Sequence, residues 1–290
     1  MPQAEGSNKV ALFSKPHPDA PDVLARLARL LEDRGFEVLP DATTAESLGL
    51  GTSIRREQAA ADARLVVSVG GDGTLLASAR AVGDNLTPIL GINLGSLGFL
   101  TETRCEEAES VLDAVLDGRA PIDSRRALRV IKNGPSTEPA PLALNDVVLS
   151  KKDLARLFSL SLFVDDEWVA DYRADGLIIA TPTGSTAYNL AAGGPLLLPG
   201  VDALIVNPIC PHSLSQRPLI LPGSAKIAVC LADRRDDGSV QVTLDGQVGF
   251  PIEAGEKVSI VGAPHPIRLL RPPGRSFFSV LRGKLGWGHP

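Results

Sequence analysis

The chain has 290 residues, of which 44% are hydrophobic and 22% are charged, and these values exclude a disordered chain and favour two domains. The formal net charge of −5, with basic residues scattered along the sequence, excludes the concentrated basic surface of a nucleic-acid-binding protein. No stretch reaches the ~18 continuous apolar residues of a membrane span, and three distant cysteines argue against a disulfide framework, so we expect a cytoplasmic protein without membrane attachment.

Strand-like and helix-like segments alternate over residues 1–120, which is the pattern of a Rossmann-like parallel sheet covered by helices. The first helix can begin at Pro21 and end at Gly35, because proline suits a first helical turn and glycine suits the residue after a helix. The expected strands are residues 9–13, 36–39, 65–69 and 89–93, and the expected helices carry Leu24, Leu27, Ala28 and Leu31, or Ala108, Val111, Leu112 and Val115, on one face.

After Pro121 the period changes to short alternating runs separated by turn residues, which predicts a β-rich, sandwich-like domain over residues 121–272. Residues 160–164 alternate before a hairpin turn at 165–167, and residues 240–244 alternate before the turn at Asp245 and Gly246. A helix is expected within 184–194. The last segment, 273–290, spaces its apolar residues like a helix and is expected to pack back on the first domain.

The sequence GGDGT at residues 70–74 follows an expected strand and opens an expected helix. Glycine turns in this position bind phosphates through backbone N–H groups and the helix dipole, although glycine and aspartate also dominate plain tight turns. The position favours a ligand site, because ligands of open α/β sheets bind at the carboxyl ends of the strands. Asp72 is then a puzzle, since a carboxylate repels phosphate.

A second candidate is the segment from Asp175 to Pro195, DGLIIATPTGSTAYNLAAGGP. Thr-Pro and Gly-Gly pairs indicate loops, and a loop is the simple interpretation. The segment, however, is crowded with hydroxyl and amide side chains, which suit the hydroxyls and ring nitrogens of a nucleotide.

Together these motifs resemble the NAD kinases. The resemblance includes GGDGT at 70–74, LGFL at 97–100, Asn145-Asp146, TPTGSTAY at 181–188, PHSL at 211–214, DGQ at 245–247 and the tail 281–288, and therefore extends over nearly the whole chain. GGDGT alone is shared with diacylglycerol kinases, sphingosine kinases and phosphofructokinases, whereas the 175–195 segment is specific.

The resemblance implies transfer of the terminal phosphate of ATP, or of polyphosphate, to the 2′-hydroxyl of the adenosine ribose of NAD, with Mg²⁺ neutralising the donor phosphates. It implies an α/β domain, a β-rich domain and a returning C-terminal segment, in a cytoplasmic homodimer or homotetramer. By motif match Asp72 is the catalytic acid that faces the hydroxyl, and Gly70, Gly71 and Thr74 lie near phosphate. The implied NAD-binding residues are Gly73, Asn145, Asp146, Arg156, Arg173, Asp175, Thr183, Thr186, Ala187, Tyr188, Asn189, Leu190, Ala191 and Gln247.

Three points stay open from the sequence. Asp72 can act on the hydroxyl proton or help to hold Mg²⁺, and no metal-ligand set stands out with confidence. Asp146 and Ala191 stand where the family often has glutamate and serine. The rival functions are a lipid kinase of the diacylglycerol kinase type, which would share only the GGDGT turn, and an NAD(P)-binding sensor without activity.

Overall fold

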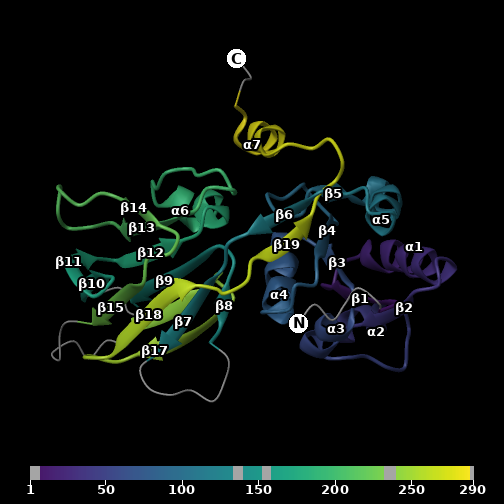
Figure 1. Cartoon of the computed structure of the whole chain (residues 1–290), viewed down its shortest axis with the longest axis horizontal. Helices are drawn as coiled ribbons and strands as arrows, with labels where there is room; N and C mark the ends of the chain where they lie inside the picture. The colour runs from purple at the N-terminus through teal and green to yellow at the C-terminus, as the bar shows by residue number, and fades with distance from the viewer. Residues whose placement is uncertain (1–6, 133–139, 152–157, 232–239, 288–290) are drawn as a thin grey trace. The chain divides into compact units, whose positions relative to one another are not determined.

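The computed structural model describes residues 7–132, 140–151, 158–231 and 240–287 (Figure 1). The chain forms two compact units. The first unit contains residues 1–124 and 265–290, and the second contains residues 125–264. The chain therefore leaves the first unit once and returns to it once.

The first unit is built on one sheet with the strand order β2-β1-β3-β4-β19-β6, and β5 also pairs with β4. The pairs from β2 to β19, and the pair of β4 with β5, are parallel. Figure 1 shows β19, in yellow, beside the much earlier β4 and β6. The strands are β1 (Lys9–Ser14), β2 (Glu37–Pro40), β3 (Leu65–Gly70), β4 (Ile89–Asn93), β5 (Thr103–Arg104), β6 (Ile122–Arg125) and β19 (Ile267–Leu270).

Helices cover both faces of this sheet, and the alternation of side chains along each strand decides which helix packs where. Leu65, Val67 and Val69 of β3 lie in one apolar cluster with the buried stripes of α1 and α5. Ser68 faces the other way, where its hydroxyl accepts from Ser78 of α4. The helices of this unit are α1 (Ala20–Asp33), α2 (Ala42–Ser47), α3 (Arg56–Asp62), α4 (Asp72–Val82), α5 (Ala108–Leu116) and α7 (Phe277–Leu285).

The second unit is a β-sandwich of two sheets, in the orders β11-β10-β15-β18-β7-β8 and β14-β13-β12-β9-β16-β17. Alternate residues of both sheets, such as Leu160 and Leu162 from one and Val240 and Val242 from the other, form one buried cluster between them. Its strands are β7 (Leu128–Lys132), β8 (Leu142–Ala143), β9 (Asp146–Lys151), β10 (Phe158–Val164), β11 (Glu167–Ala174), β12 (Gly176–Ala180), β13 (Ala203–Ile209), β14 (Leu219–Pro222), β15 (Ile227–Leu231), β16 (Val240–Leu244), β17 (Val248–Ile252) and β18 (Lys257–Gly262).

The outer face of the second sheet is also covered over its centre. Ile178, Ala180 and Ile205 form a smaller apolar cluster there, against which Ala192 and Leu197 pack. This second layer explains why β12 is buried at every residue and reads as a continuous apolar run. It also fixes the 181–197 segment against the end of β12.

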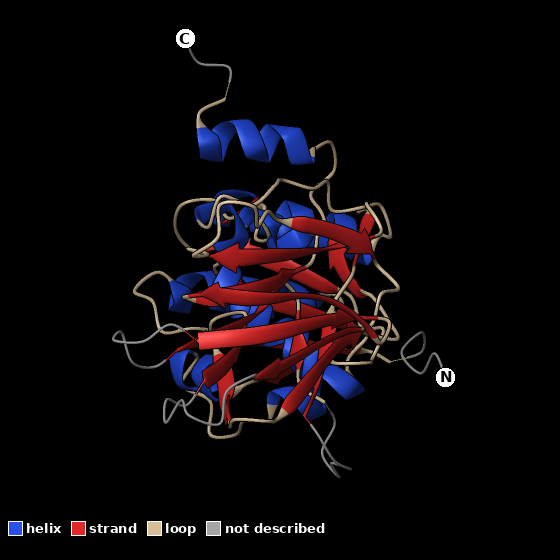
Figure 2. Ribbon diagram, turned by 90° about the vertical axis from the view of Figure 1, so that its left-hand side faces the viewer, coloured by secondary structure: helices blue, strands red, loops and turns tan. Residues whose placement is uncertain are grey.

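The predicted fold class is confirmed: an α/β unit with a parallel sheet, a β-rich unit and a final helix that belongs to the first unit. Figure 2 shows the strands in red and the helices in blue, and α7 is the helix next to the label of the C-terminus. The expected strands and helices of residues 9–118 are present, as are the hairpin turn at 165–166 and the helix in the tail.

The helix expected within 184–194 is present, as a 3₁₀ helix (Thr183–Thr186) followed by α6 (Tyr188–Ala191), and the segment is not one continuous helix. Its hydroxyls bond to nearby backbone carbonyls, as Thr186 does to Thr183, and such bonds compete with helix formation. The returning segment was expected from residue 273. The structure returns to the first unit at residue 265, because β19 pairs with β4.

Candidate functional site

The turn between β3 and α4 carries the GGDGT sequence. Gly70 ends the strand, Gly71 precedes the helix in extended conformation, and Asp72 is the first helical residue. The N–H groups of Thr74 and Leu75 donate to the Gly71 carbonyl at 2.9 and 3.1 Å. A side chain at Gly70 would overlap the Thr74 side chain, so the tight entry into α4 requires glycine there.

The Asp72 carboxylate lies against residues 98–101, which are the end of the LGFL segment (97–100) and the threonine that follows it. Its Oδ2 accepts from the Phe99 N–H at 2.9 Å, and its Oδ1 accepts from the N–H groups of Leu100 and Thr101 at 3.1 and 2.9 Å. The Thr101 hydroxyl donates to Oδ1 at 2.8 Å. A side chain at Gly98 would overlap this carboxylate. Two motifs that the sequence shows separately are therefore one structure.

Asn93, the last residue of β4, supports this arrangement from behind. Its amide Nδ2 donates to the Thr101 hydroxyl at 2.7 Å, and its Oδ1 accepts from the Gly95 N–H at 2.7 Å. Asn93 is 5% exposed and Thr101 is fully buried. A chain of hydrogen bonds thus runs from Asn93 through Thr101 to Asp72.

The sheet register aligns three charged or polar positions with the turn. Gly70 pairs with Asn93, and Asn93 pairs with Arg104 on β5, so these residues form one row at the carboxyl edge. On the other side Ser14 pairs with Val69, which puts Lys15 beside Gly70. The Lys15 Nζ atom lies 3.8 Å from where a Gly71 Cβ would be. No motif in the sequence marks Lys15 as a site residue, and its position directly after a buried strand is the one signal for it.

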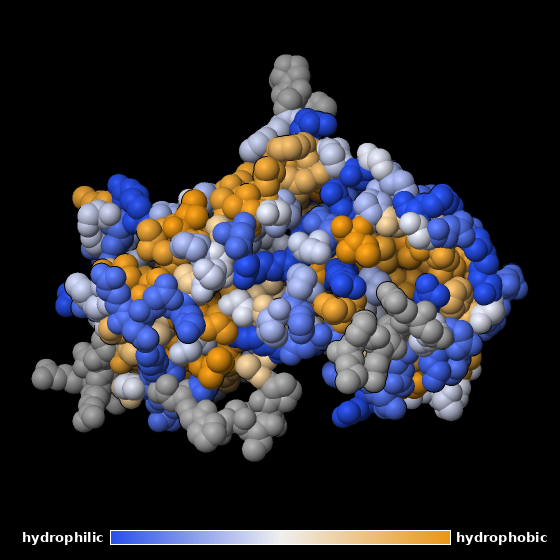
Figure 3. Space-filling view, in the orientation of Figure 1, coloured by the Kyte–Doolittle hydropathy of each residue, from blue (hydrophilic) through white to orange (hydrophobic). Residues whose placement is uncertain are grey.

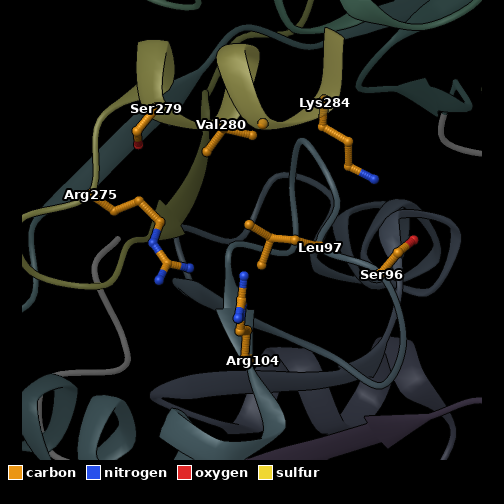
Figure 4. Close-up of a pocket in the computed structure, with 8 residues that line it drawn as sticks. Ser96, Leu97, Arg104, Arg275, Ser279, Val280 and Lys284 are labelled. Atoms are coloured by element: carbon orange, nitrogen blue, oxygen red, sulfur yellow. The ribbon is translucent and has the colours of Figure 1, made fainter. Parts of the chain in front are cut away.

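A pocket of about 370 Å³ lies between α7 and the residues after β4 (Figure 4). In Figure 4 the side chains of Arg104 and Arg275 extend toward Leu97, and Lys284 extends from α7. Arg275 pairs with Glu107 at 3.1 Å and donates to the Glu102 carbonyl. Three basic side chains, Arg104, Arg275 and Lys284, line this pocket. Its other lining residues are Ser96, Leu97, Ser279, Val280 and Gly283.

In the second unit, Asp245 holds the strand that carries Asn145 and Asp146. Its carboxylate accepts from the N–H groups of Leu144, Asn145 and Asp146 at 3.1, 2.7 and 3.3 Å. Asp245 has a positive φ of 53° in the hairpin turn between β16 and β17, a conformation that aspartate tolerates.

The 181–186 segment is fixed onto the same strand. Thr181 donates its N–H to the Asn145 carbonyl at 2.9 Å and its hydroxyl to the Leu144 carbonyl at 2.6 Å. The Thr181 oxygen in turn accepts from the Gly184 N–H at 3.1 Å. A Cβ at Gly184 would lie 2.8 Å from the Asn145 Cα, so only glycine fits. Asn145, Asp146 and Thr183 are thereby brought together.

Asp146 is an unusual acid. It is 4% exposed, and burial together with the charge of Asp245 raises its pKa to about 7. An acid in this state is half protonated near neutral pH and can donate or accept a hydrogen bond. Perturbed acids of this kind are common in binding sites.

The remaining predicted residues of the second unit differ in exposure. The Asn189 side chain is fully buried, donates to the Pro195 carbonyl at 3.0 Å and accepts from Asn207 at 3.1 Å, so its amide holds the loop. Tyr188 is 47% exposed. Arg173, Asp175, Ala191 and Gln247 are exposed, Thr186, Ala187 and Leu190 are half-buried, and Arg156 lies outside the described residues. Their contact with NAD stays a prediction.

Comparison with known proteins gives the class of protein first. A family model described as the ATP-NAD kinase N-terminal domain matches residues 10–120, and the ATP-NAD kinase C-terminal domain matches residues 144–271. The two domains thus match the α/β unit and the β-sandwich, and they define a kinase with two domains.

Individual relatives agree. The NAD kinase of Geotalea daltonii is 42% identical over 282 residues, which is 97% of this chain and 99% of the relative, and that of Solibacter usitatus is 44% identical over 96% of both. The chain belongs to the NAD kinase family. Yeast NADH kinase complexed with NADH superposes with a TM-score of 0.85 at 27% identity, covering 98% of this chain and 89% of that one. An NAD kinase from Archaeoglobus fulgidus in complex with ATP superposes with a TM-score of 0.78 at 26% identity. The match covers 96% of this chain and 98% of that one.

Proposed function

We propose that the protein phosphorylates the 2′-hydroxyl of the adenosine ribose of NAD with ATP and produces NADP and ADP. The observation that carries this proposal is the GGDGT turn at the carboxyl edge of the parallel sheet, in a chain whose two units both match NAD kinase domains. The solved relatives were crystallised with NADH and with ATP. A lipid kinase receives no support, because the second unit matches the NAD kinase family as well.

In this reaction the ribose oxygen bonds to the γ-phosphorus, the bond from that phosphorus to the β,γ-bridging oxygen breaks, and the ribose proton is lost. Asp72 is proposed to accept this proton. A carboxylate cannot ionise a sugar hydroxyl in advance, because the hydroxyl is far less acidic, so its help comes late in the step. Base assistance of this kind contributes roughly 10²- to 10⁴-fold.

The donor phosphates are proposed to bind at Gly70, Gly71, Gly73 and Thr74. The start of α4 supplies backbone dipoles that favour an anion. Lys15, whose amine lies beside Gly71, adds a positive charge at the same place. The neighbouring negative charge of Asp72 is then offset while its own hydrogen bonds hold it toward residues 99–101.

NAD is proposed to bind through the second unit. Asn145 and Asp146 would hold the nicotinamide side of the molecule, and Thr183 with residues 186–191 would surround the nucleotide. The support is local: these residues lie on one cross-linked assembly of β9, the 181–186 segment and the 245–247 turn. Arg156, Arg173, Asp175 and Gln247 are proposed as further contacts.

Mg²⁺ is proposed to reach the protein with ATP. Among the described residues no group of three or more histidine, cysteine or acidic side chains gathers in a metal-binding arrangement. Both Asp72 oxygens already accept N–H or O–H donors. Such a site fits an ion held mainly by the donor phosphates, where it neutralises their charge.

A homo-oligomer, dimer or tetramer, is proposed on the surface of the second unit. Leu198, Val201, Leu214 and Ile220 are large apolar side chains that are 43–95% exposed. Figure 3 shows apolar atoms, in orange, over the side of β13 and β14. Exposed apolar patches of this kind are typical of interfaces.

The proposed location is the cytoplasm. Cys105, Cys210 and Cys230 are all free thiols, as a reducing compartment would leave them. None of the helices in the described ranges has the length and hydropathy to cross a bilayer.

The deciding experiment incubates the purified protein with NAD, ATP and Mg²⁺ and measures NADP with an NADP-specific dehydrogenase. Parallel reactions replace ATP with GTP or polyphosphate, NAD with NADH, and NAD with diacylglycerol. NADP formation that depends on ATP and Mg²⁺ is expected. Binding of NAD without NADP formation would instead identify a sensor, and phosphorylation of diacylglycerol alone would identify a lipid kinase.

A further inference from the structure

The two oxygens of the Asp72 carboxylate have unequal surroundings. Oδ1 accepts three hydrogen bonds, from the N–H groups of Leu100 and Thr101 and from the Thr101 hydroxyl. Oδ2 accepts one, from the Phe99 N–H at 2.9 Å. Because a carboxylate oxygen offers about two lone-pair directions, Oδ1 is saturated and Oδ2 keeps one direction open.

The direction of the Thr101 hydroxyl proton is fixed by Asn93. The Asn93 Nδ2 lies 2.7 Å from the Thr101 oxygen and can only donate to it, because its own Oδ1 accepts from the Gly95 N–H. Thr101 has a single hydroxyl proton. Because the Thr101 oxygen accepts from Asn93, this proton is donated to the other close partner of the hydroxyl, Asp72 Oδ1, at 2.8 Å. Both side chains are buried, so water does not replace these partners readily.

We propose that Thr101, oriented by Asn93, is a positioning residue that occupies Oδ1 of Asp72 and leaves Oδ2 as the oxygen that takes the ribose hydroxyl proton. This inference rests on the proposed function. Thr101 does not touch the reacting atoms itself. It fixes the rotation of the carboxylate, and with it the direction of the free lone pair, before the substrate binds.

The chain supplies a matched control two residues further on. Thr103 is also fully buried, and its hydroxyl has no hydrogen-bond partner in the described structure. Thr101→Val and Thr103→Val remove the same hydroxyl and keep the same shape, on the same short segment. A purely structural effect of burying valine is therefore common to both variants, whereas loss of the contact to Asp72 is confined to Thr101→Val.

The experiment compares steady-state kinetics and melting temperatures of the wild type, Thr101→Val, Thr101→Ser and Thr103→Val. We expect Thr101→Val to lower kcat about 10-fold or more, with KM for NAD and ATP within roughly threefold, as loss of one oriented contact to a reacting group predicts. Thr101→Ser should recover most of kcat because it keeps the hydroxyl. Thr103→Val should match the wild type.

The division of the effect between kcat and KM is a readout that a purely structural role would not produce, because misfolded protein lowers the active fraction in Thr103→Val as well as in Thr101→Val. Asn93→Asp removes the amide donor that orients Thr101. This variant should therefore lower kcat, as Thr101→Val does. The double variant with Thr101→Val should be little worse than Thr101→Val alone.

Equal kcat values for Thr101→Val and Thr103→Val would overturn the proposal, as would failure of Thr101→Ser to recover activity. These outcomes differ from failure of the proposed function. If the wild type makes no NADP, the function itself is wrong. If the wild type is active and Asp72→Asn is slow while Thr101→Val is normal, only the positioning role of Thr101 is wrong.

Discussion

At the scale of single residues, the Asp72 carboxylate has one role in stability and a second, proposed role in catalysis. It accepts four hydrogen bonds from residues 99–101, and it is the proposed proton acceptor. Asparagine keeps the size but places an N–H₂ group against at least one of these donors. A loss of stability of about 1–3 kcal/mol is expected from that mismatch alone.

Asp72→Asn should therefore lower both the melting temperature and kcat. We expect kcat to fall roughly 10²- to 10⁴-fold, because a general base contributes about that much, with KM for NAD within a few fold. Kinetics at a temperature well below melting separate the two effects, and titration of Mg²⁺ shows whether the ion requirement changes. Near-normal turnover would exclude the base role. A changed Mg²⁺ requirement would assign Asp72 to the metal.

Asp146 predicts a pH dependence of stability. Its pKa is raised by burial and by Asp245 from 3.8 to about 7, so the folded state binds this proton more tightly than the unfolded state does. The contribution of Asp146 to the free energy of unfolding is thus fully present below about pH 4. It is lost as pH rises from there through 7.

Asp146→Asn should remove this dependence. The variant should gain stability relative to the wild type between pH 5 and pH 8. Each kcal/mol gained in the free energy of unfolding should raise the melting temperature by about 2–4 °C. Differential scanning fluorimetry across this range measures the change. Asp33→Asn, at an exposed acid of α1, serves as the control. A constant difference between wild type and Asp146→Asn at all pH values would contradict the raised pKa.

At the scale of elements, the loop from residue 94 to 101 joins the edge of the sheet to Asp72. Gly98 and Gly95 lie in this same loop but differ in the room around them. A Cβ at Gly98 would overlap the Asp72 carboxylate, whereas a Cβ at Gly95 would meet only the Asn93 Oδ1, at 3.9 Å. Gly98→Ala should lower kcat at least about 10-fold by displacing Asp72, and Gly95→Ala should stay near the wild type. Equal kcat values would show that the loop yields without moving Asp72.

The edge of the sheet also predicts a role for Lys15. Its Nζ lies beside Gly71, and no hydrogen bond or ion pair of its side chain occurs within the described residues, so it is available to a phosphate. Lys15→Gln should raise KM for ATP about 10-fold or more, as hydrogen bonds to charged groups predict, with little change in KM for NAD. Lys9→Gln, at the start of the strand β1 that Lys15 follows, is the control. Its amine lies 3.9 Å from Glu37, away from the turn. Unchanged KM for ATP in Lys15→Gln would remove Lys15 from the donor site.

At the scale of the whole molecule, the β-sandwich is an insertion in the α/β unit, and residues 265–290 complete the first sheet. β19 pairs with β4, and Arg271 after it contacts the nearly buried Glu102 at 3.1 Å.

A chain ending at Pro264 should lose the first unit to proteolysis. A chain ending at Ser276 keeps β19 and loses α7, which buries only two of its nine residues, Val280 and Leu281, so it should stay folded. Limited proteolysis with mass spectrometry tests both, and survival of the first unit without β19 would refute its structural role.

The sequence alone was enough to predict the alternating α/β segment, the β-rich segment and the residues of the GGDGT turn. These features follow from local periodicity and turn chemistry, which short stretches such as 65–74 contain within themselves. It did not predict α2 or α3, whose few apolar residues make no clear period, nor the split of the 184–194 segment, where side chains bond to the backbone.

Only the tertiary structure decided which distant residues lie together. Asp72 meets residues 99–101, Lys15 lies beside Gly71, and β19 completes a sheet begun some 250 residues earlier in the chain, by the register of the strands. These contacts depend on strand order and register, which are set by packing between remote segments and leave no local pattern. The sequence by itself determined what the turn is made of. The fold decided that its acid faces residues 99–101, with Oδ1 saturated by hydrogen bonds and one lone-pair direction of Oδ2 left open.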